Sequence, residues 1–158
     1  MRRLEREQHL PHPPEDVFPF FADALNLERI TPPWLGFRVI GPDAIEMGPG
    51  TLIEYRLRLH RVPVRWLTRI EVWEPPLRFL DAQVRGPYRV WRHEHTFTAE
   101  RRGGAEGTLM RDRVDYGLPL GPLGAVAHRL FVRRDLERIF DHRASAVARL
   151  APAGRAGG

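Results

Sequence analysis

The stretch PLGAVAHRLFVRRDLERIFDHRASAVARL, from Pro122 to Leu150, decides the fold class, because its apolar residues recur at the spacing of a helix. It predicts a terminal helix of about 25 residues. One stripe of this helix contains Val132, Leu136, Ile139, Phe140, Val147 and Leu150. Such a stripe indicates that one face of the helix is buried against another layer of the protein.

The first turns of this stretch do not follow the stripe. Leu123, Val126, Ala127 and Leu130 lie on roughly the opposite side of a straight helix. Either the helix kinks or begins late near Arg129, or its first turns are apolar on two faces. We consider two roles for these residues: a mobile apolar lip at the mouth of a pocket, or a kinked segment packed under the earlier helices.

Upstream of this helix, apolar and polar residues alternate, which is the pattern of strands with one buried and one wet face. In the run Thr51–His60, for example, Ile53 and Tyr55 flank Glu54. Turn signals such as Gly86-Pro87 separate the runs. The predicted strands are Arg2–Leu10, Trp34–Ile40, Thr51–His60, Val64–Trp73, Leu77–Arg85, Tyr88–Ala99 and Thr108–Leu118.

Two short helices are predicted between the first two strands. Glu15 and Asp16 stand where the start of a helix favours acidic residues, and Pro19 keeps this first helix short. The second helix covers Ala24–Ile30 and ends before two prolines. The chain therefore reads as strand, two short helices, six strands and one long helix.

Composition excludes several classes of function. The chain has no cysteine, which excludes disulfides and thiolate sites and suits a reducing, cytoplasmic location. All 25 basic residues are arginine, but they are interleaved with 20 acidic residues rather than clustered, so no nucleic-acid partner is expected. No apolar run is long enough for stable membrane insertion, and no apolar segment follows the basic N-terminus as in a secretory signal.

The order of elements predicts an α+β fold in which a curved seven-stranded antiparallel sheet wraps around the long C-terminal helix. We expect residues 1–150 to form a single domain and residues 151–158 to form a disordered tail. One helix about 10 Å wide cannot fill so curved a sheet. The remaining space becomes either a ligand pocket or a core filled by the four tryptophans and eight phenylalanines.

Several motifs resemble the START-like SRPBCC superfamily, in its bacterial polyketide cyclase/dehydrase-like branch, over roughly residues 3–145. The motifs are HLPHPPEDVF (9–18), TPPW (31–34), WEPP (73–76), WRHEHTF (91–97) and GTLMRDRV (107–114). The resemblance implies a helix-grip fold with a cavity, in a superfamily whose members bind lipids, sterols, quinones and polyketides. Related domains are sometimes fused to epimerase-like domains, so an epimerase-like partner is considered beside a homodimer.

Strand alternation places polar residues on the inner wall. His93 and His95 share a strand face with two aromatic residues, and Asp112 shares one with Met110 and Val114. On the strand Leu77–Arg85 the two faces are hard to distinguish; if Phe79 points inward, Asp81 and Gln83 do so as well. The remaining histidines, at positions 9, 12, 60, 128 and 142, are expected at the surface.

These inward polar groups allow four interpretations. They form a satisfied network that fixes the register of the sheet, or they anchor the polar end of an apolar ligand. Alternatively, a histidine oriented by Asp112 acts as a general base for cyclisation or dehydration next to a carbonyl, with His93, His95 and Asp112 as the catalytic residues. A metal site from the His-x-His pair and a carboxylate is the fourth, although one strand pair rarely completes a ligand shell, and neither metal nor cofactor is expected.

The sequence thus predicts a protein that binds a small hydrophobic molecule, resembling a lipid, quinone or polyketide, between the sheet and the terminal helix. The alternatives are a cyclase/dehydrase-type enzyme in the same cavity and a filled-core structural or interaction module. The expected ligand-binding residues are Tyr55, Leu57, Trp66, Ile70, Phe79, Asp81, Gln83, Trp91, Met110, Val114, Leu136, Ile139 and Phe140.

Overall fold

The computed structural model describes residues 1–42 and 44–150, so the predicted tail at 151–158 lies outside the described residues. The described elements are β1 (Arg2–Leu10), α1 (Pro14–Phe21), α2 (Asn26–Ile30), the 3-10 turn η1 (Pro33–Leu35), β2 (Arg38–Ile40), β3 (Leu52–Leu59), β4 (Val62–Glu74), β5 (Arg78–Arg85), β6 (Val90–Ala99), β7 (Thr108–Gly117), α3 (Gly121–Ala127), the π turn η2 (His128–Val132) and α4 (Arg133–Leu150). Their order is the predicted one.

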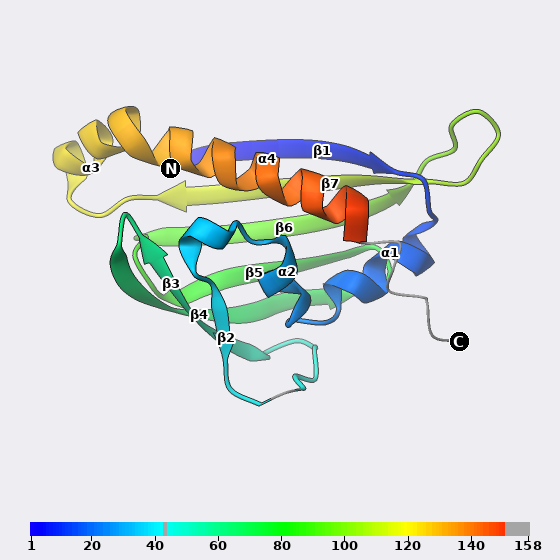
Figure 1. Ribbon diagram of the computed structural model, residues 1–158, viewed down its shortest axis with the longest axis horizontal. Coiled ribbons are helices and arrows are strands. Elements are labelled where there is room, and N and C mark those ends of the chain that lie inside the picture. Colours follow the sequence, from blue (N-terminus) through cyan, green and yellow to red (C-terminus); the bar gives the residue numbers. More distant parts are fainter. Residues whose placement is uncertain (43, 151–158) are drawn as a thin grey trace.

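All seven strands join one antiparallel sheet in the order β1-β7-β6-β5-β4-β3-β2. Figure 1 shows α4 running along β1 and β7, while α1 and α2 lie over the strands farther along the sheet. The predicted helix-grip architecture is confirmed. It leaves the strands on the β3–β5 side covered by short helices and loops rather than by the long helix.

The second predicted strand is too long. Only Arg38–Ile40 pairs in the sheet, whereas Trp34 and Leu35 lie in the 3-10 turn η1. The turn ends at Gly36, which adopts a left-handed backbone (φ 55°) that residues with a side chain rarely adopt. The two prolines before Trp34 therefore begin a turn rather than a strand.

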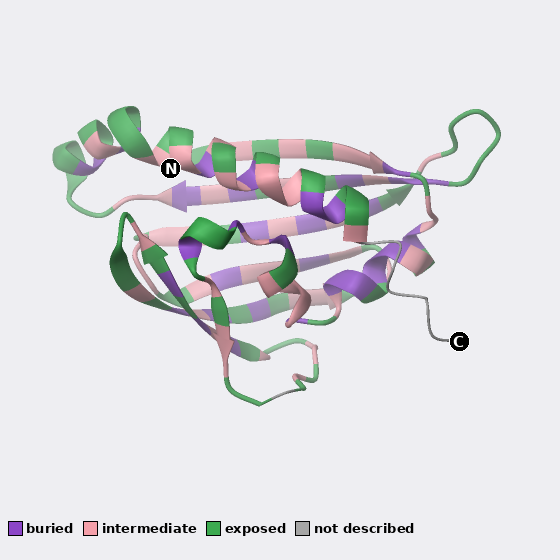
Figure 2. Ribbon diagram, viewed as in Figure 1, coloured by how far each residue is buried: buried purple, intermediate pink, exposed green. Residues whose placement is uncertain are grey.

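The buried residues of the sheet and of α4 lie where the two periods predict them. On α4, Leu136, Phe140 and Val147 are buried, and buried and exposed residues alternate along the strands (Figure 2). α1 contributes Phe18 and Phe21 to a core cluster beneath the C-terminal end of α4. One group of aromatic residues thus fills the end of the sheet beside α1, while a second group, which includes Trp66, Tyr88 and Trp91, lies farther along the sheet.

The C-terminal helix is interrupted, which confirms the kink among the alternatives drawn from the sequence. The π turn His128–Val132 separates α3 from α4. The extra residue per turn changes the helical phase, so Leu123 and Leu130 are exposed at 71% and 59% instead of packing under the earlier helices.

Within the described residues, no helix is both long and apolar enough to span a bilayer.

Candidate functional site

A cavity of about 170 Å³ lies between the sheet and α4, so the aromatic side chains do not fill the hollow. Of the residues expected in its wall, the following line it: Tyr55, Leu57, Trp66, Ile70, Phe79, Asp81, Trp91, His93, His95, Leu136, Ile139 and Phe140. The wall is mostly apolar, with its charged and imidazole side chains on β5, β6 and α4. A cavity of about 150 Å³ with apolar walls stays dry and accepts one aromatic ring, which sets the scale for an occupant.

Four expected site residues lie outside this wall. Met110 is buried in the cluster beside α1, and Val114 packs against Leu136 and Phe140. Both lie on β7, whose inner face α4 covers, so the cavity is displaced toward β3–β6. Asp112, also on β7, reaches the site only through its neighbours.

Gln83, the fourth, has a structural role instead. Its side-chain amide donates to the backbone carbonyl of Tyr88 at 2.7 Å, and its oxygen accepts from the Tyr88 backbone N–H at 3.2 Å. This pair of bonds closes the connection between β5 and β6. Tyr88 itself lines the cavity, so Gln83 supports the wall from behind.

Sequence reasoning missed the wall formed by the segment from α1 to η1, and it missed Arg143. The segment contributes Phe21, Ala24, Leu27, Ile30, Thr31, Pro32 and Leu35. Its apolar spacing indicates two packed short helices, and nothing in one sequence separates packing from pocket lining. Arg143 lines the cavity from α4 and is one of 25 arginines, so its position carries no signal before the helix is placed.

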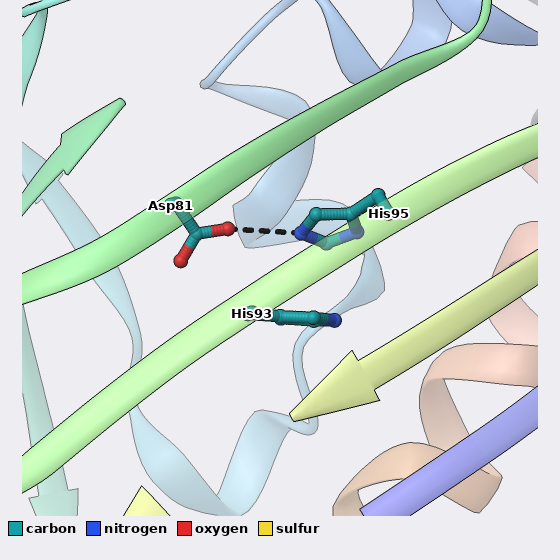
Figure 3. Close-up of side chains that lie close together, drawn as sticks. All are labelled: Asp81, His93 and His95. Atoms are coloured by element: carbon teal, nitrogen blue, oxygen red, sulfur yellow. Dashed lines mark hydrogen bonds and ion pairs between the residues drawn. The ribbon is translucent and has the colours of Figure 1, made fainter. Parts of the chain in front are cut away.

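His95 lies between two carboxylates. Its Nε2 atom is 2.9 Å from Asp81 Oδ2 (Figure 3), and its Nδ1 atom is 3.0 Å from Asp112 Oδ1. Burial alone lowers the pKa of His95, but hydrogen bonds to Asp112 and Asp81 outweigh burial and raise it. Because both ring nitrogens face an acceptor, the geometry suits the doubly protonated imidazolium.

His93 is in the opposite electrostatic state. Its Nε2 atom lies 2.8 Å from Asp112 Oδ1, and its ring is 3.7 Å from that of His95. Burial, with the charge of His95 as the second cause, lowers the pKa of His93 to about 4. His93 is therefore neutral at pH 7, with Nε2 donating to Asp112 and Nδ1 without a hydrogen-bond partner among the described residues.

Arg143 completes the charge balance. Its Nη2 atom is 3.9 Å from Asp112 Oδ1 and 3.4 Å from His95 Nδ1. Although burial favours the neutral acid, the charge of Arg143 and the hydrogen bonds from the two histidines hold the pKa of Asp112 well below its usual range. Two carboxylates thus meet one guanidinium and one imidazolium, so the buried group of charges is neutral overall.

The nitrogen and oxygen ligand atoms of Asp81, His93 and His95 lie within 4.8 Å of one another, close enough to hold a metal ion. Two imidazoles and a carboxylate are donors that a transition metal accepts. However, Asp81 and His95 are already paired with each other, and Arg143 supplies positive charge beside Asp112. The charges of this group are thus balanced by its own side chains, and we assign it no metal.

Two buried donors in the cavity wall lack partners among the described residues: Trp66 Nε1 and Arg143 Nε. A buried N–H without an acceptor costs about 1–3 kcal/mol. An occupant with oxygen acceptors would remove that cost if a shift of either side chain brought its nitrogen to the cavity surface. The wall therefore favours an apolar body that carries at least one polar atom.

The comparisons with known proteins agree with this architecture. The family model described as "Polyketide cyclase / dehydrase and lipid transport" matches residues 1–151. The chain belongs to this family. No curated protein sequence matches it.

Solved structures share the fold of this cyclase/dehydrase family member at low sequence identity. The Zhui aromatase/cyclase from Streptomyces sp. R1128 has a TM-score of 0.75 and 19% identity, over 99% of this chain and 98% of that one. TTHA0849 from Thermus thermophilus has a TM-score of 0.70 and 20% identity, over 98% and 100%. Protein Ms6760 from Mycobacterium smegmatis has a TM-score of 0.68 and 18% identity, over 96% and 91%. At these identities the likeness describes the fold.

Proposed function

We propose that this family member binds a small hydrophobic molecule, with an aromatic body and one or more oxygen acceptors, in the cavity between the sheet and α4. The observation that carries the proposal is an apolar cavity with two unpaired buried donors, Trp66 Nε1 and Arg143 Nε, in its wall. A filled core would have left no such space. The cavity volume favours a compact ring system over a long acyl chain.

The test is a titration with 1,4-naphthoquinone, which combines two fused rings with two carbonyl oxygens, and with naphthalene, which lacks the oxygens. We expect saturable binding of both compounds, tighter for the quinone. Ile139 lines the cavity and is half-buried, so Ile139→Trp should fill the space at little cost to the fold and abolish binding. Val132, on the π turn and outside the wall, gives the control Val132→Trp, which should bind normally. Equal behaviour of the two variants would refute the assignment of the cavity.

A second candidate function is supported by the polar end of the same cavity. His93 is neutral, is held at Nε2 by Asp112, and has an Nδ1 lone pair free of protein donors among the described residues. The free Nδ1 can accept a proton and Asp112 fixes the ring in one tautomer, which are two requirements of a general base for proton abstraction beside a carbonyl. His95, fixed between two carboxylates, would supply positive charge rather than take a proton.

Proton abstraction is measured directly by hydrogen–deuterium exchange at the central carbon of an aryl 1,3-diketone. Catalysis predicts exchange above the buffer rate, and a loss of about 10²-fold in His93→Gln. The variant should still bind the diketone, because glutamine retains a donor to Asp112. Exchange at the buffer rate in the unmodified protein would leave binding as the function and exclude this chemistry.

We also propose a cellular location and two protein partners. The proposed location is the cytoplasm, and the observation that supports it is the absence of cysteine from the sequence. The homodimer and the epimerase-like partner are proposals to be tested by the molar mass in solution and by co-purification.

A further inference from the structure

The segment from α3 into the π turn presents apolar side chains to solvent. Figure 2 shows α3 as mainly exposed, at the end of the molecule away from α1. We name the following residues the apolar patch, with their exposed fractions: Leu120 75%, Leu123 71%, Val126 55%, Leu130 59% and Phe131 57%. Isolated exposed leucines are ordinary, but a contiguous group marks a surface that contacts something.

A basic groove adjoins the apolar patch. It is lined by Arg2, Ala125, Val126, His128, Arg129 and Arg133. Arg133 is paired with Glu137 at 3.1 Å, whereas Arg2 and Arg129 form no ion pair within the described residues. Residues 117–134 include no acidic residue. The groove thus presents unneutralised positive charge beside exposed apolar side chains.

His128 explains why this surface is held in place. Against the expectation of a surface residue, it is buried, and its Nε2 atom lies 2.7 Å from the Tyr116 hydroxyl on β7. The bond fixes the π turn to the sheet. Burial, followed by the charges of Arg2 and Arg133, lowers the pKa of His128, so the ring is neutral and adds no charge of its own.

From this juxtaposition we propose that the apolar patch and the basic groove together dock the protein on an anionic phospholipid surface. Apolar side chains enter the boundary between head groups and acyl chains, and the arginines meet the lipid phosphates. A second copy of this chain is a poorer occupant, because a two-fold contact would bring the same unpaired arginines face to face. Docking would place the start of α4, whose Leu136 lines the cavity, near the membrane.

The test is co-sedimentation of the full chain with vesicles of phosphatidylcholine, with and without phosphatidylglycerol. We expect binding to the anionic vesicles, weakened by salt, and little to the neutral ones. Leu123→Ser with Leu130→Ser should reduce the partition coefficient about tenfold or more. Arg129→Gln should reduce it about fivefold.

Matched controls lie on surfaces remote from the patch. Leu77→Ser, at the turn between β4 and β5, removes an apolar side chain of 61% exposure, and Arg101→Gln, in the turn between β6 and β7, removes the same charge as Arg129→Gln. Both should bind like the unmodified protein. Ile139→Trp should also bind, so that docking and cavity occupancy are tested separately.

Several results would overturn the proposal. One is an absence of binding to anionic vesicles; another is an equal loss in patch variants and controls. A dimer in sedimentation velocity that Leu123→Ser with Leu130→Ser dissociates would assign the patch to self-association instead. Arg129→Gln keeps the test decisive if the double serine variant fails to fold, since Arg129 is exposed.

Discussion

Replacement of His93 by glutamine should change how stability depends on pH. His93 has a pKa of about 4 in the folded protein, against the usual 6.5. Because the folded pKa is depressed, the contribution of this group is fully present above pH 6.5 and is lost as the pH falls toward 4. At 1.36 kcal/mol per pKa unit, the loss over this window is about 3 kcal/mol. Glutamine still donates to Asp112 but does not titrate.

The measurement is urea unfolding, followed by tryptophan fluorescence, at several pH values from 7 to 4. The unmodified protein should lose about 3 kcal/mol more unfolding free energy across this window than His93→Gln. His128, whose pKa is also lowered, titrates in both proteins and cancels in the difference. Asp81 and Asp112, whose pKa values are lowered from 3.8, and His95, whose pKa is raised from 6.5, contribute only at the two edges of this range and are present in both proteins. Parallel stability curves for the two proteins would refute the neutral, buried state assigned to His93.

Two further substitutions test the polar end of the cavity. Asp112→Asn should cost about 3–5 kcal/mol of unfolding free energy, because it leaves Arg143 and His95 with one carboxylate for two buried positive charges. The control on the same strand is Asp115→Asn, which removes an exposed ion pair with Arg3 and should cost less than about 1 kcal/mol of unfolding free energy in urea. Similar costs for the two variants would show that the buried group of charges is not needed for the fold. Trp66→Phe removes an unpaired donor, so stability should be unchanged or higher, while calorimetry should show about fivefold weaker binding of 1,4-naphthoquinone and unchanged binding of naphthalene. Equal losses for the two compounds would show that Trp66 contributes shape rather than a hydrogen bond.

The alternation of apolar and polar residues predicted the sheet and the inward direction of His93 and His95, whereas on β5 it left the two faces undecided. His93, His95 and Phe79 are buried as this period requires. Alternation shows which side chains share a face of the sheet, however, and not which helix covers that face. Met110 and Val114 share the inner face but lie beneath α1 and α4, so the position of the cavity depended on where the long helix crosses the sheet.

Sequence periodicity was least informative where the backbone leaves regular structure. The out-of-phase residues at the start of the C-terminal stretch indicated an irregularity, and the π turn is that irregularity. Nothing in the period showed whether Leu123 and Leu130 would be covered or exposed. The partner of Asp112 was also hidden: the helical stripe was defined by apolar residues, and Arg143 is a charged residue beside that stripe whose guanidinium reaches inward.

The proposed function requires that the cavity between the sheet and α4 holds a small molecule. Native mass spectrometry of the protein purified without detergent measures this directly, for the unmodified chain, Ile139→Trp and Val132→Trp. We expect an added mass, from a compound with ring carbons and oxygen, on the unmodified protein and Val132→Trp but not on Ile139→Trp. Bare masses for all three proteins, together with no binding of the quinone, would contradict the proposed function.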